Sequence, residues 1–274
     1  MTAVIELNGG LGNQLFQTAL ACEMRARGHE VLLNGVSIDP GRGLQVRSIA
    51  DSLGLQVEQA VAANSRLRRA LAMERTLIES SSRFDPLVLK QSSRRNIRLR
   101  GYWQSEQYFP TVGELVKHTY LTVFERHLTP RGHDLLALAS EPGAVSMHIR
   151  RGDYVTNPSA AATHGVLSLD YYRTALKRFG DPSAVLVFSD DLDWVEETFG
   201  GGRFHVVSPE FTTEAAGELR LMAACSRHII ANSSFSWWGA WLGGPEHDVI
   251  APAQWFVSNE YDASDIVPIR WKTL

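Results

Sequence analysis

The stretch that decides the fold is residues 228–243, which read HIIANSSFSWWGAWLG. A short β-branched run at 228–231 predicts a buried strand, and 234–242 predicts a helix that ends at Gly243. The serines between the two segments can cap the helix, or they can hydrogen-bond a phosphate at the positive end of the helix dipole. A strand that runs directly into a helix is the repeating unit of an α/β protein.

The same order of strand and helix recurs along the chain. Strands are predicted at residues 3–7, 31–33, 145–150, 185–188, 204–207 and 249–251, and helices at 13–27, 170–179 and 214–225. This alternation predicts mainly parallel sheets. A length of 274 residues corresponds to about two domains. We place the boundary between Pro130 and Pro142, which gives domains at 1–135 and 136–274.

The composition is that of a soluble globular protein, with 44% apolar and 21% charged residues. A net charge of −3, from 27 basic and 30 acidic residues, argues against a nucleic-acid partner, which would require a strongly basic chain. Cys22 and Cys225 form no Cys-x-x-Cys pair, which favours a reducing compartment. Residues 1–7 lack the basic region of a signal peptide and 229–245 is too polar for a membrane span, so we expect a cytoplasmic protein.

Charge is distributed unevenly along the chain. Residues 66–100 hold ten Lys or Arg against three Asp or Glu, a net charge of +7. Residues 190–218 hold eight acids against Arg203 alone, a net charge of −7. For the basic stretch we favour a solvated face. The alternative is contact with an anionic acceptor or, peripherally, with the inner face of a membrane.

Residues 8–14 read NGGLGNQ and place glycines between a predicted strand and a predicted helix. This layout suits anions, because free N–H groups and the positive end of the helix dipole point outward. A dinucleotide-binding loop would need glycine where Leu15 stands, so the pattern does not favour a dinucleotide cofactor. A tight turn and a ligand loop are equally compatible with these residues.

Residues 148–153 read HIRRGD at the end of a predicted strand. Strand periodicity places His148 and Arg150 on one face and Arg151 on the other. Open α/β sheets bind ligands at the carboxyl ends of their strands, and an arginine there offers a rigid fork of donors for a phosphate. We assign this phosphate role to Arg150, whereas a salt bridge is the favoured role of Arg151.

Arg150 and the serine-rich helix start at 233–236 are two phosphate-binding devices in one chain, and together they indicate a nucleotide leaving group. Three tryptophans follow, Trp237, Trp238 and Trp241. Their pattern is more typical of side chains that pack in a core than of aromatic rings that stack on a substrate.

The acidic run at 190–193 contains Asp191 and Asp193, which match the Asp-x-Asp pattern of metal-dependent sugar transferases. Acidic residues are also favourable in the first turn of a helix, which Trp194 and Val195 continue. We prefer the helix explanation and expect no bound metal.

Five segments together resemble glycosyltransferase family 11, the α-1,2-fucosyltransferases. They are GGLGNQ at 9–14, GYWQ at 101–104 with Tyr108 and Phe109, HIRRGDY at 148–154, DYY at 170–172 and IIANSSFSWW at 229–238. The resemblance implies a GT-B fold, in which two Rossmann-like domains face each other across a cleft. It also implies GDP-L-fucose as donor, inversion at the sugar carbon, no metal or other cofactor, and a galactose-containing acceptor that reacts at its 2-hydroxyl.

The resemblance also implies roles for individual residues. Arg150 holds the β-phosphate, Asn13 reaches the phosphate and the fucose, and Glu218 reads guanine N–H groups. The full set of implied donor-binding residues besides Arg150 and Asn13 is Gly12, Gln14, His148, Arg151, Glu218, Asn232, Ser233, Ser234 and Phe235. Asp153 is a candidate base for the acceptor hydroxyl, although a structural hydrogen bond is the favoured role, and a dissociative reaction needs no strong base.

Three alternatives stay open. They are a GT-B transferase with another nucleotide sugar or acceptor hydroxyl, a nucleotide-binding oxidoreductase, and a non-catalytic carbohydrate-binding protein. Leu15 argues against the oxidoreductase, and the two phosphate devices argue against the binding protein. Residues 40–98 match no motif of the family, and acceptor choice is expected there. The acceptor, free or lipid-linked, is therefore left open.

Overall fold

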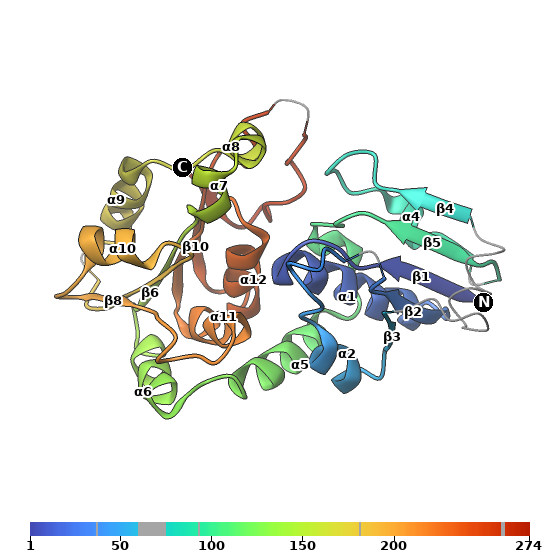
Figure 1. Cartoon of the computed structure of the whole chain (residues 1–274), viewed down its shortest axis with the longest axis horizontal. Coiled ribbons are helices and arrows are strands. Elements are labelled where there is room, and N and C mark those ends of the chain that lie inside the picture. The colour runs from blue at the N-terminus through green and yellow to red at the C-terminus, as the bar shows by residue number, and fades with distance from the viewer. Residues whose placement is uncertain (37, 60–74, 93, 181, 259–260) are drawn as a thin grey trace. The chain divides into compact units, whose positions relative to one another are not determined.

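The structure is a computed structural model that describes residues 1–36, 38–59, 75–92, 94–180, 182–258 and 261–274 (Figure 1). It divides into two compact units. Unit 1 comprises Met1–Val123 and Ser264–Ile266, and unit 2 comprises Phe124–Ala263 and Val267–Leu274. Each unit has one parallel β-sheet accompanied by helices, which confirms the predicted α/β class.

Unit 1 contains a five-stranded parallel sheet in the order β3-β2-β1-β5-β4. Its strands are β1 (Thr2–Glu6), β2 (Glu30–Asn34), β3 (Gln56–Glu58), β4 (Arg75–Ile78) and β5 (Ile97–Arg100). Its described helices are α1 (Leu11–Ala26), α2 (Arg47–Ser52), α4 (Pro86–Leu89), the 3₁₀ helix η1 (Glu106–Tyr108) and α5 (Gly113–Glu125), whose end belongs to unit 2. The order of strands reverses between β1 and β5, which makes this point the topological switch of the sheet.

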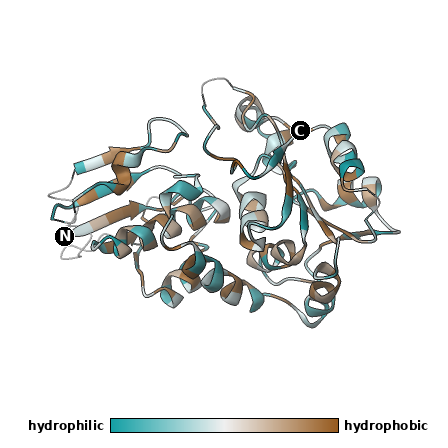
Figure 2. Cartoon of the chain, turned by 180° about the vertical axis from the view of Figure 1, so that it is seen from behind, coloured by the Kyte–Doolittle hydropathy of each residue, from teal (hydrophilic) through white to brown (hydrophobic). Residues whose placement is uncertain are grey.

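The core of unit 1 is formed by apolar residues that recur at the spacing of a strand or of a helix, so that they lie on one face of the element. Figure 2 shows hydrophobic residues along the strands of each sheet. Helix α1 buries Leu15, Ala19 and Cys22, whose helical spacing predicts it. The turn before α1 depends on Gly9, whose φ of 73° is left-handed. A Cβ atom at Gly9 would lie 2.3 Å from Asn13 Nδ2, so the turn requires glycine for space as well.

The strands β3, β4 and β5 are not predicted by the sequence. Edge strand β4 has three exposed residues out of four, so it shows no alternation of apolar and polar side chains. In strand β5, buried Ile97 and Leu99 alternate with arginines. The high local charge of this segment is typical of an exposed loop, so the sequence does not indicate a strand.

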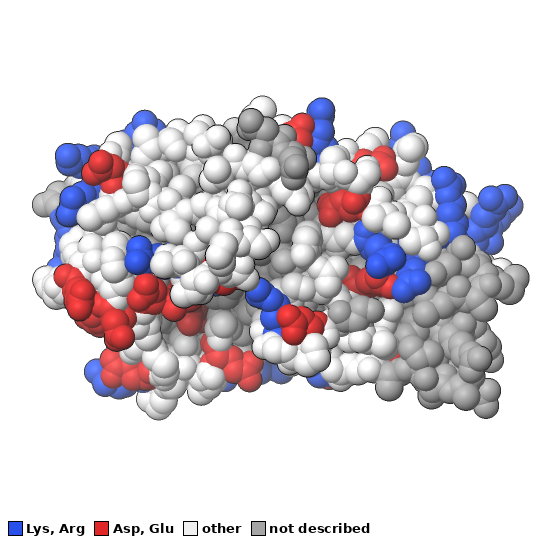
Figure 3. All heavy atoms as spheres, turned by 45° about the horizontal axis from the view of Figure 1, so that its top comes forward, with Lys and Arg blue, Asp and Glu red and all other residues white. Residues whose placement is uncertain are grey.

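The basic stretch at 66–100 lies partly outside the described residues, which omit 66–74 and 93. Figure 3 shows basic side chains on the surface of the protein. The exposed members among the described residues include Arg75, Arg83, Lys90, Arg94 and Arg95. Arg98 and Arg100 instead bind the buried carboxylate of Glu6 on β1, with Arg100 Nε 2.8 Å from Glu6 Oε2. The described part therefore combines exposed basic side chains with two arginines of β5 that bind within the sheet.

Unit 2 contains a six-stranded parallel sheet in the order β11-β10-β9-β6-β7-β8. Its strands are β6 (Val145–Ile149), β7 (Val185–Ser189), β8 (Phe204–Val206), β9 (Arg227–Ile229), β10 (Asp248–Ala251) and β11 (Lys272–Thr273). Its described helices are α6 (Pro130–Ala139), α7 (Gly152–Thr156), α8 (Pro158–His164), α9 (Leu169–Arg178), α10 (Leu192–Phe199), α11 (Ala215–Ala224) and α12 (Ser234–Gly243). The topological switch lies between β6 and β9, the strands that the quoted motifs follow.

The tryptophans that follow the serine-rich helix start at 233–236 pack in the core of unit 2. Trp237 and Trp238 have no exposed surface. The ring of Trp237 stacks on Trp241 at 6.0 Å between centroids and lies 5.6 Å from the ring of Trp271. This confirms the packing interpretation. Within the part of the chain that the structure describes, no helix is long and apolar enough to cross a bilayer.

The expected boundary at 135 and 136 falls inside α6, whereas the compact units separate after Val123. Helix α6 belongs to unit 2 because its start is bonded to the segment before α11. Thr129 N donates to Phe211 O at 3.0 Å, and Thr129 Oγ1 donates to Glu210 O at 2.6 Å. The prolines near 130 and 142 therefore mark the start of a helix and a loop within unit 2. Part of the C-terminal region, Ser264–Ile266, groups with unit 1, where Asp265 accepts a hydrogen bond from Phe84 N.

The contact between α6 and Phe211 predicts a sensitive position. A Cβ atom at Gly132 would lie 2.1 Å from Phe211 O. We expect Gly132→Ala to lower the free energy of unfolding of unit 2 by about 1–2 kcal/mol, because overpacking outweighs the ~1 kcal/mol by which a helix prefers alanine to glycine. Urea unfolding followed by tryptophan fluorescence measures this change.

The control is His133→Ala at the next, exposed position of α6, where we expect a change within about 0.5 kcal/mol. Equal stabilities of the Gly132→Ala and His133→Ala proteins would show that α6 does not press on Phe211.

Candidate functional site

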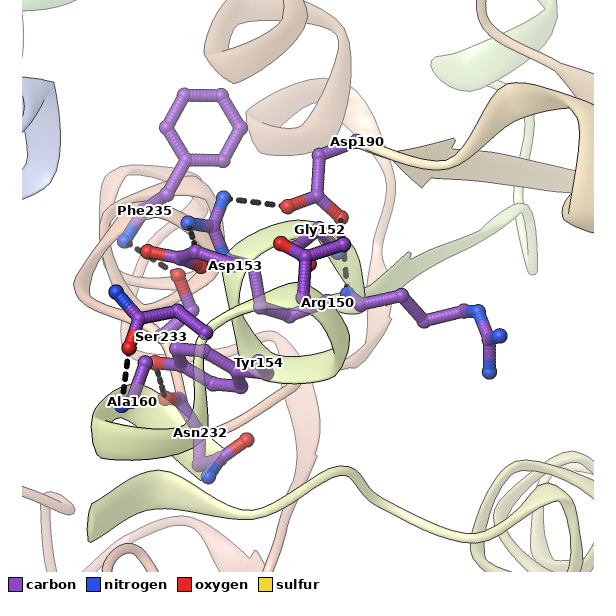
Figure 4. A network of polar contacts seen from close by, with 12 residues as sticks. Arg150, Gly152, Asp153, Tyr154, Ala160, Asp190, Asn232, Ser233 and Phe235 are labelled. Atoms are coloured by element: carbon purple, nitrogen blue, oxygen red, sulfur yellow. Dashed lines mark hydrogen bonds and ion pairs between the residues drawn. The ribbon is translucent and has the colours of Figure 1, made fainter. Parts of the chain in front are cut away.

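The candidate site lies at the carboxyl ends of three neighbouring strands of unit 2. Residues 150–153 follow β6, Asp190 follows β7, and residues 232–235 follow β9 (Figure 4). Strands β6 and β9 flank the topological switch, where open α/β sheets bind ligands. The sheet order thus brings together motifs that lie about eighty residues apart in the sequence, as when Tyr154 Oη donates to Asn232 O at 3.2 Å.

Arg150 lies at the centre of this site and is held between two carboxylates. Its Nη2 donates to Asp153 Oδ1 at 2.6 Å, and its Nη1 lies 2.8 Å from Asp190 Oδ2. Its guanidinium carbon lies 5.3 Å from the ring centre of Tyr154. The side chain is 26% exposed, so the guanidinium is fixed in orientation and still reaches solvent. An anionic ligand at this position would compete with the two carboxylates for one arginine.

Asp190 also fixes the backbone that follows β6. Its Oδ1 accepts hydrogen bonds from Arg151 N at 2.9 Å and from Gly152 N at 3.1 Å. A Cβ atom at Gly152 would lie 2.2 Å from Asp190 Oδ2, so the turn requires glycine at that position. One carboxylate therefore shapes the turn and orients the guanidinium of Arg150.

Sequence reasoning missed this role of Asp190 and considered only a metal site or a helix start. The signal that could have found it is strand register. Ile149 on β6 pairs with Ser189 on β7, so Arg150 and Asp190 each follow a member of the same pair. A register derived from the buried strand residues would have placed the two charges side by side.

Arg151 forms the salt bridge that the sequence favours. Its Nε donates to Asp191 Oδ2 at 2.9 Å, and its guanidinium carbon lies 4.1 Å from the ring centre of Trp194. The hydrogen bond from Arg151 lowers the pKa of Asp191. Asp191 Oδ1 also accepts from Trp194 N at 3.3 Å and thereby caps α10. The carboxylate of Asp191 is thus bound to an arginine and a helix start, as the helix explanation of the acidic run predicts.

Ser233 caps α12 at the end of the β9 motif. Its Oγ accepts from Phe235 N at 3.3 Å, and Ser234 is the first residue of the helix. The side chain of Asn232 points into protein, because its Nδ2 donates to His164 O at 2.7 Å and to Trp255 O at 3.2 Å. Asn232 therefore ties this motif to α8 and to residue 255, and the serines provide the helix start that the sequence predicts.

His148 is a buried, neutral side chain beside Arg150. Burial, followed by the charge of Arg150, lowers the pKa of His148 to about 3. Its Nδ1 is buried and has no hydrogen-bond partner among the described residues. Its ring centre lies 5.6 Å from that of Phe235, which connects the β6 and β9 motifs. His148 is therefore a neutral, buried neighbour of Arg150.

Glu218 on α11 has a carboxyl group whose pKa is strongly raised. Burial, followed by the charge of Asp190, raises its pKa to about 7. Its carboxyl group therefore titrates near neutral pH and shares its electrostatic environment with the carboxylate that orients Arg150. Shifted carboxyl groups of this kind are frequent at functional sites.

The residues predicted from the glycine-rich start all lie in unit 1. Asn13 Oδ1 accepts from Gln104 Nε2 at 2.7 Å, and both side chains are partly exposed. Gln14 is buried, with Nε2 donating to Gly9 O at 3.0 Å and to Gly43 O at 2.9 Å. Gln14 thus holds a neighbouring loop against the turn, and Gly12 lies buried in the first turn of α1.

The arrangement in unit 2 can recognise an anion and stabilise charge that develops on it. A partly exposed guanidinium, a neutral imidazole and a capped helix start converge on the switch point of the sheet. Among the residues that the structure describes, no group of three or more His, Cys, Asp or Glu side chains could hold a metal ion.

Comparisons with known proteins identify the kind of protein that carries this site. The family described as "Glycosyl transferase family 11" matches residues 80–274. The chain is 30% identical to the "O-antigen biosynthesis glycosyltransferase WbnK" of Escherichia coli, over 92% of this chain and 94% of that protein. It is also 30% identical to an "Alpha-1,2-colitosyltransferase" of Escherichia coli, over 98% and 97% of the two chains.

A more distant relative and a solved structure are also similar to this chain. The "Galactoside 2-alpha-L-fucosyltransferase Sec1" of Mus musculus is 26% identical over 66% of this chain and 58% of that protein. Among solved structures, a glycosyl transferase family 9 protein from Veillonella parvula superposes with a TM-score of 0.51 at 10% identity, over 100% of this chain and 86% of the other. Two α/β units with parallel sheets are the domains of the GT-B fold, which confirms the expected fold class. The chain belongs to glycosyltransferase family 11.

Proposed function

We propose that the protein transfers L-fucose from GDP-β-L-fucose to the 2-hydroxyl of a galactoside, with inversion at the sugar carbon and without a metal ion. The observation that carries the proposal is Arg150, held by Asp153 and Asp190 at the switch point of the unit 2 sheet. The names of the fucosyl- and colitosyltransferase relatives support α-1,2 transfer of a deoxy sugar.

In this proposal Arg150 binds the β-phosphate. Negative charge grows on that phosphate as the bond to the sugar breaks, and a fixed guanidinium stabilises it without reorganisation. The N-terminus of α12, from Ser233 to Phe235, faces the diphosphate with the positive end of its dipole. Asn13 contributes an amide to the phosphate and the fucose, and Glu218 accepts hydrogen bonds from guanine.

Asp153 serves in this proposal as the partner of Arg150 and not as a base. Its Oδ1 lies 2.6 Å from Arg150 Nη2, so the carboxylate is engaged by a cation. Departure of GDP ahead of attack makes the sugar carbon electrophilic enough that a strong base is not required.

Metal independence is supported by the positions of the two aspartates in the Asp-x-Asp pattern. Asp191 accepts from Arg151 and caps α10, and Asp193 lies in the first turn of that helix. The charge that a divalent cation would supply at the diphosphate comes instead from Arg150.

A colitose donor is the second candidate, because the colitosyltransferase relative matches almost the whole chain. The acceptor in either case is a galactose-containing glycan, free or lipid-linked. We propose that the protein acts in the cytoplasm, where the exposed arginines of unit 1 allow at most peripheral contact with a membrane.

The donor assignment predicts selective stabilisation by a guanine nucleotide. We expect GDP to raise the melting temperature, because a ligand that binds only the folded state stabilises it. UDP and NADH should leave the melting temperature unchanged, and a chelator should not alter the effect of GDP. Differential scanning fluorimetry measures all of these arms. A larger rise in melting temperature with UDP, or loss of the GDP effect with chelator, contradicts the proposal. A separate activity assay distinguishes the two donors: turnover of GDP-colitose without turnover of GDP-fucose selects the second candidate.

The role of Arg150 predicts a large loss of rate in a folded protein. We expect Arg150→Ala to reduce turnover of GDP-fucose with lactose by at least ~100-fold, as removal of one preorganised donor typically does. The control is Arg173→Ala, which removes an exposed arginine from α9 of the same unit. Circular dichroism verifies folding of both variants. Near-normal turnover by folded Arg150→Ala would exclude the assignment.

Glu218 predicts a pH dependence of donor binding. Its pKa of about 7 means that the free protein holds a proton there below neutral pH. Guanine N–H groups require the ionised carboxylate, so affinity for GDP-fucose should rise between pH 6 and 8, by up to about tenfold per pH unit below the pKa. GDP-fucose is the suitable ligand because its diphosphate has no terminal phosphate that titrates in this range.

The matched variant for this measurement is Glu218→Gln, examined by calorimetry. It should bind GDP-fucose more weakly at pH 8 and lose the dependence on pH. An unchanged pH profile in Glu218→Gln would assign the titration to another group.

A further inference from the structure

The sequence motif at 101–104 occupies the switch point of the unit 1 sheet. Residues 101–104 follow β5, and residues 8–10 follow its neighbour β1. Crevices outside the carboxyl ends of such strands are the usual ligand sites of open α/β sheets. None of the proposed phosphate-binding residues belongs to residues 101–104.

The turn at 101–104 has a strained backbone, and contacts with neighbouring residues hold it in that conformation. Trp103 has a φ of 57°, a left-handed conformation that is unfavourable for a bulky residue, and it is 1% exposed. Glu79 stabilises the turn, because its Oε2 accepts from Tyr102 N at 2.6 Å and its Oε1 accepts from Trp103 N at 3.1 Å. A Cβ atom at Gly101 would lie 2.5 Å from Glu79 Cβ, so this approach requires glycine. Backbone strain that is held in this manner is typical of functional sites.

Two glutamines fix the same turn to α1. Gln17 Nε2 donates to Gly101 O at 2.9 Å, and Gln104 Nε2 donates to Asn13 Oδ1 at 2.7 Å. Trp103 O also accepts from Ser105 N at 2.8 Å. The turn is therefore tied to α1 at both of its ends and is a preorganised element.

The turn presents an aromatic ring and an amide oxygen. Tyr102 is 46% exposed although its neighbour Trp103 is buried. The bond from Gln104 Nε2 to Asn13 fixes the amide of Gln104, and no hydrogen bond among the described residues uses Gln104 Oε1. Both oxygens of Glu79 are engaged by backbone N–H groups, so the turn offers no carboxylate to a ligand.

An exposed aromatic ring and an amide oxygen on one turn, without a charged side chain among residues 101–104, match a neutral sugar ring. A pyranose has a face of C–H groups that packs on an aromatic ring and a rim of hydroxyls that donate hydrogen bonds. A nucleotide diphosphate would instead require cations of the kind found at the switch point of unit 2.

We propose that residues 101–104 are an acceptor subsite, in which the ring of Tyr102 stacks on the galactose ring and Gln104 Oε1 accepts a hydrogen bond from one of its hydroxyls. This inference rests on the proposed function, because it identifies where unit 1 holds the galactoside. Glu79, Gln17 and Asn13 are positioning residues that maintain the turn.

The test separates acceptor binding from donor binding. We expect Tyr102→Ala to raise KM for lactose about tenfold or more, equivalent to about 1.4 kcal/mol, with KM for GDP-fucose unchanged. Tyr102→Phe keeps the ring and should behave as wild type, and Tyr102→Leu keeps bulk without the ring and should resemble Tyr102→Ala. The control is Leu115→Ala on α5, which removes an equally exposed apolar side chain, at 46%, from the same unit.

An unchanged acceptor KM in folded Tyr102→Ala or Tyr102→Leu overturns the subsite. So does an equal rise in both KM values, which would indicate a general disturbance of unit 1. Failure of the proposed function is distinguished from these results, because the wild-type protein would then transfer neither fucose nor colitose to any galactoside.

Discussion

The ion pair between Arg150 and Asp190 is the interaction on which the candidate site depends. The register of β6 and β7 places the two residues after a matched pair of strand positions. The same carboxylate accepts two backbone N–H groups of the turn that begins α7, and it occupies the space that a side chain at residue 152 would need. Asp190 therefore determines both the orientation of the Arg150 guanidinium and the backbone conformation of the turn before α7, so that a change in one alters the other.

Electrostatics within unit 2 follow from this ion pair. Arg150 has two carboxylate partners, so the free site carries more negative than positive charge at its centre. The charge of Asp190 adds to burial in raising the pKa of Glu218, and the charge of Arg150 adds to burial in lowering the pKa of His148. An anionic ligand that binds Arg150 must compete with Asp153 or Asp190, so binding there exchanges one anionic partner of the arginine for another.

The sequence was informative where a local pattern determines the structure. The buried strands and the strand ends at Arg150 and Ser233 could be predicted, because β-branched runs and helix caps are local features. Strand β4 could not, because three of its four residues are exposed, and the boundary was placed inside α6, because only contacts with residues 210–211 assign that helix to unit 2. The role of Asp190 depends on sheet register and lies beyond local patterns.

Each unit has a switch point, and the two differ in chemistry. In unit 2 a partly exposed guanidinium stands among carboxylates, whereas in unit 1 a strained turn presents a tyrosine ring and an amide while its carboxylate, Glu79, is engaged by backbone. In the function that we propose, the charged groups of unit 2 suit a diphosphate that must leave, and the neutral groups of unit 1 suit a sugar that must bind in one orientation and then depart as product. The two switch points therefore divide the proposed function, with recognition of charge assigned to the sheet of unit 2 and recognition of the sugar assigned to the sheet of unit 1.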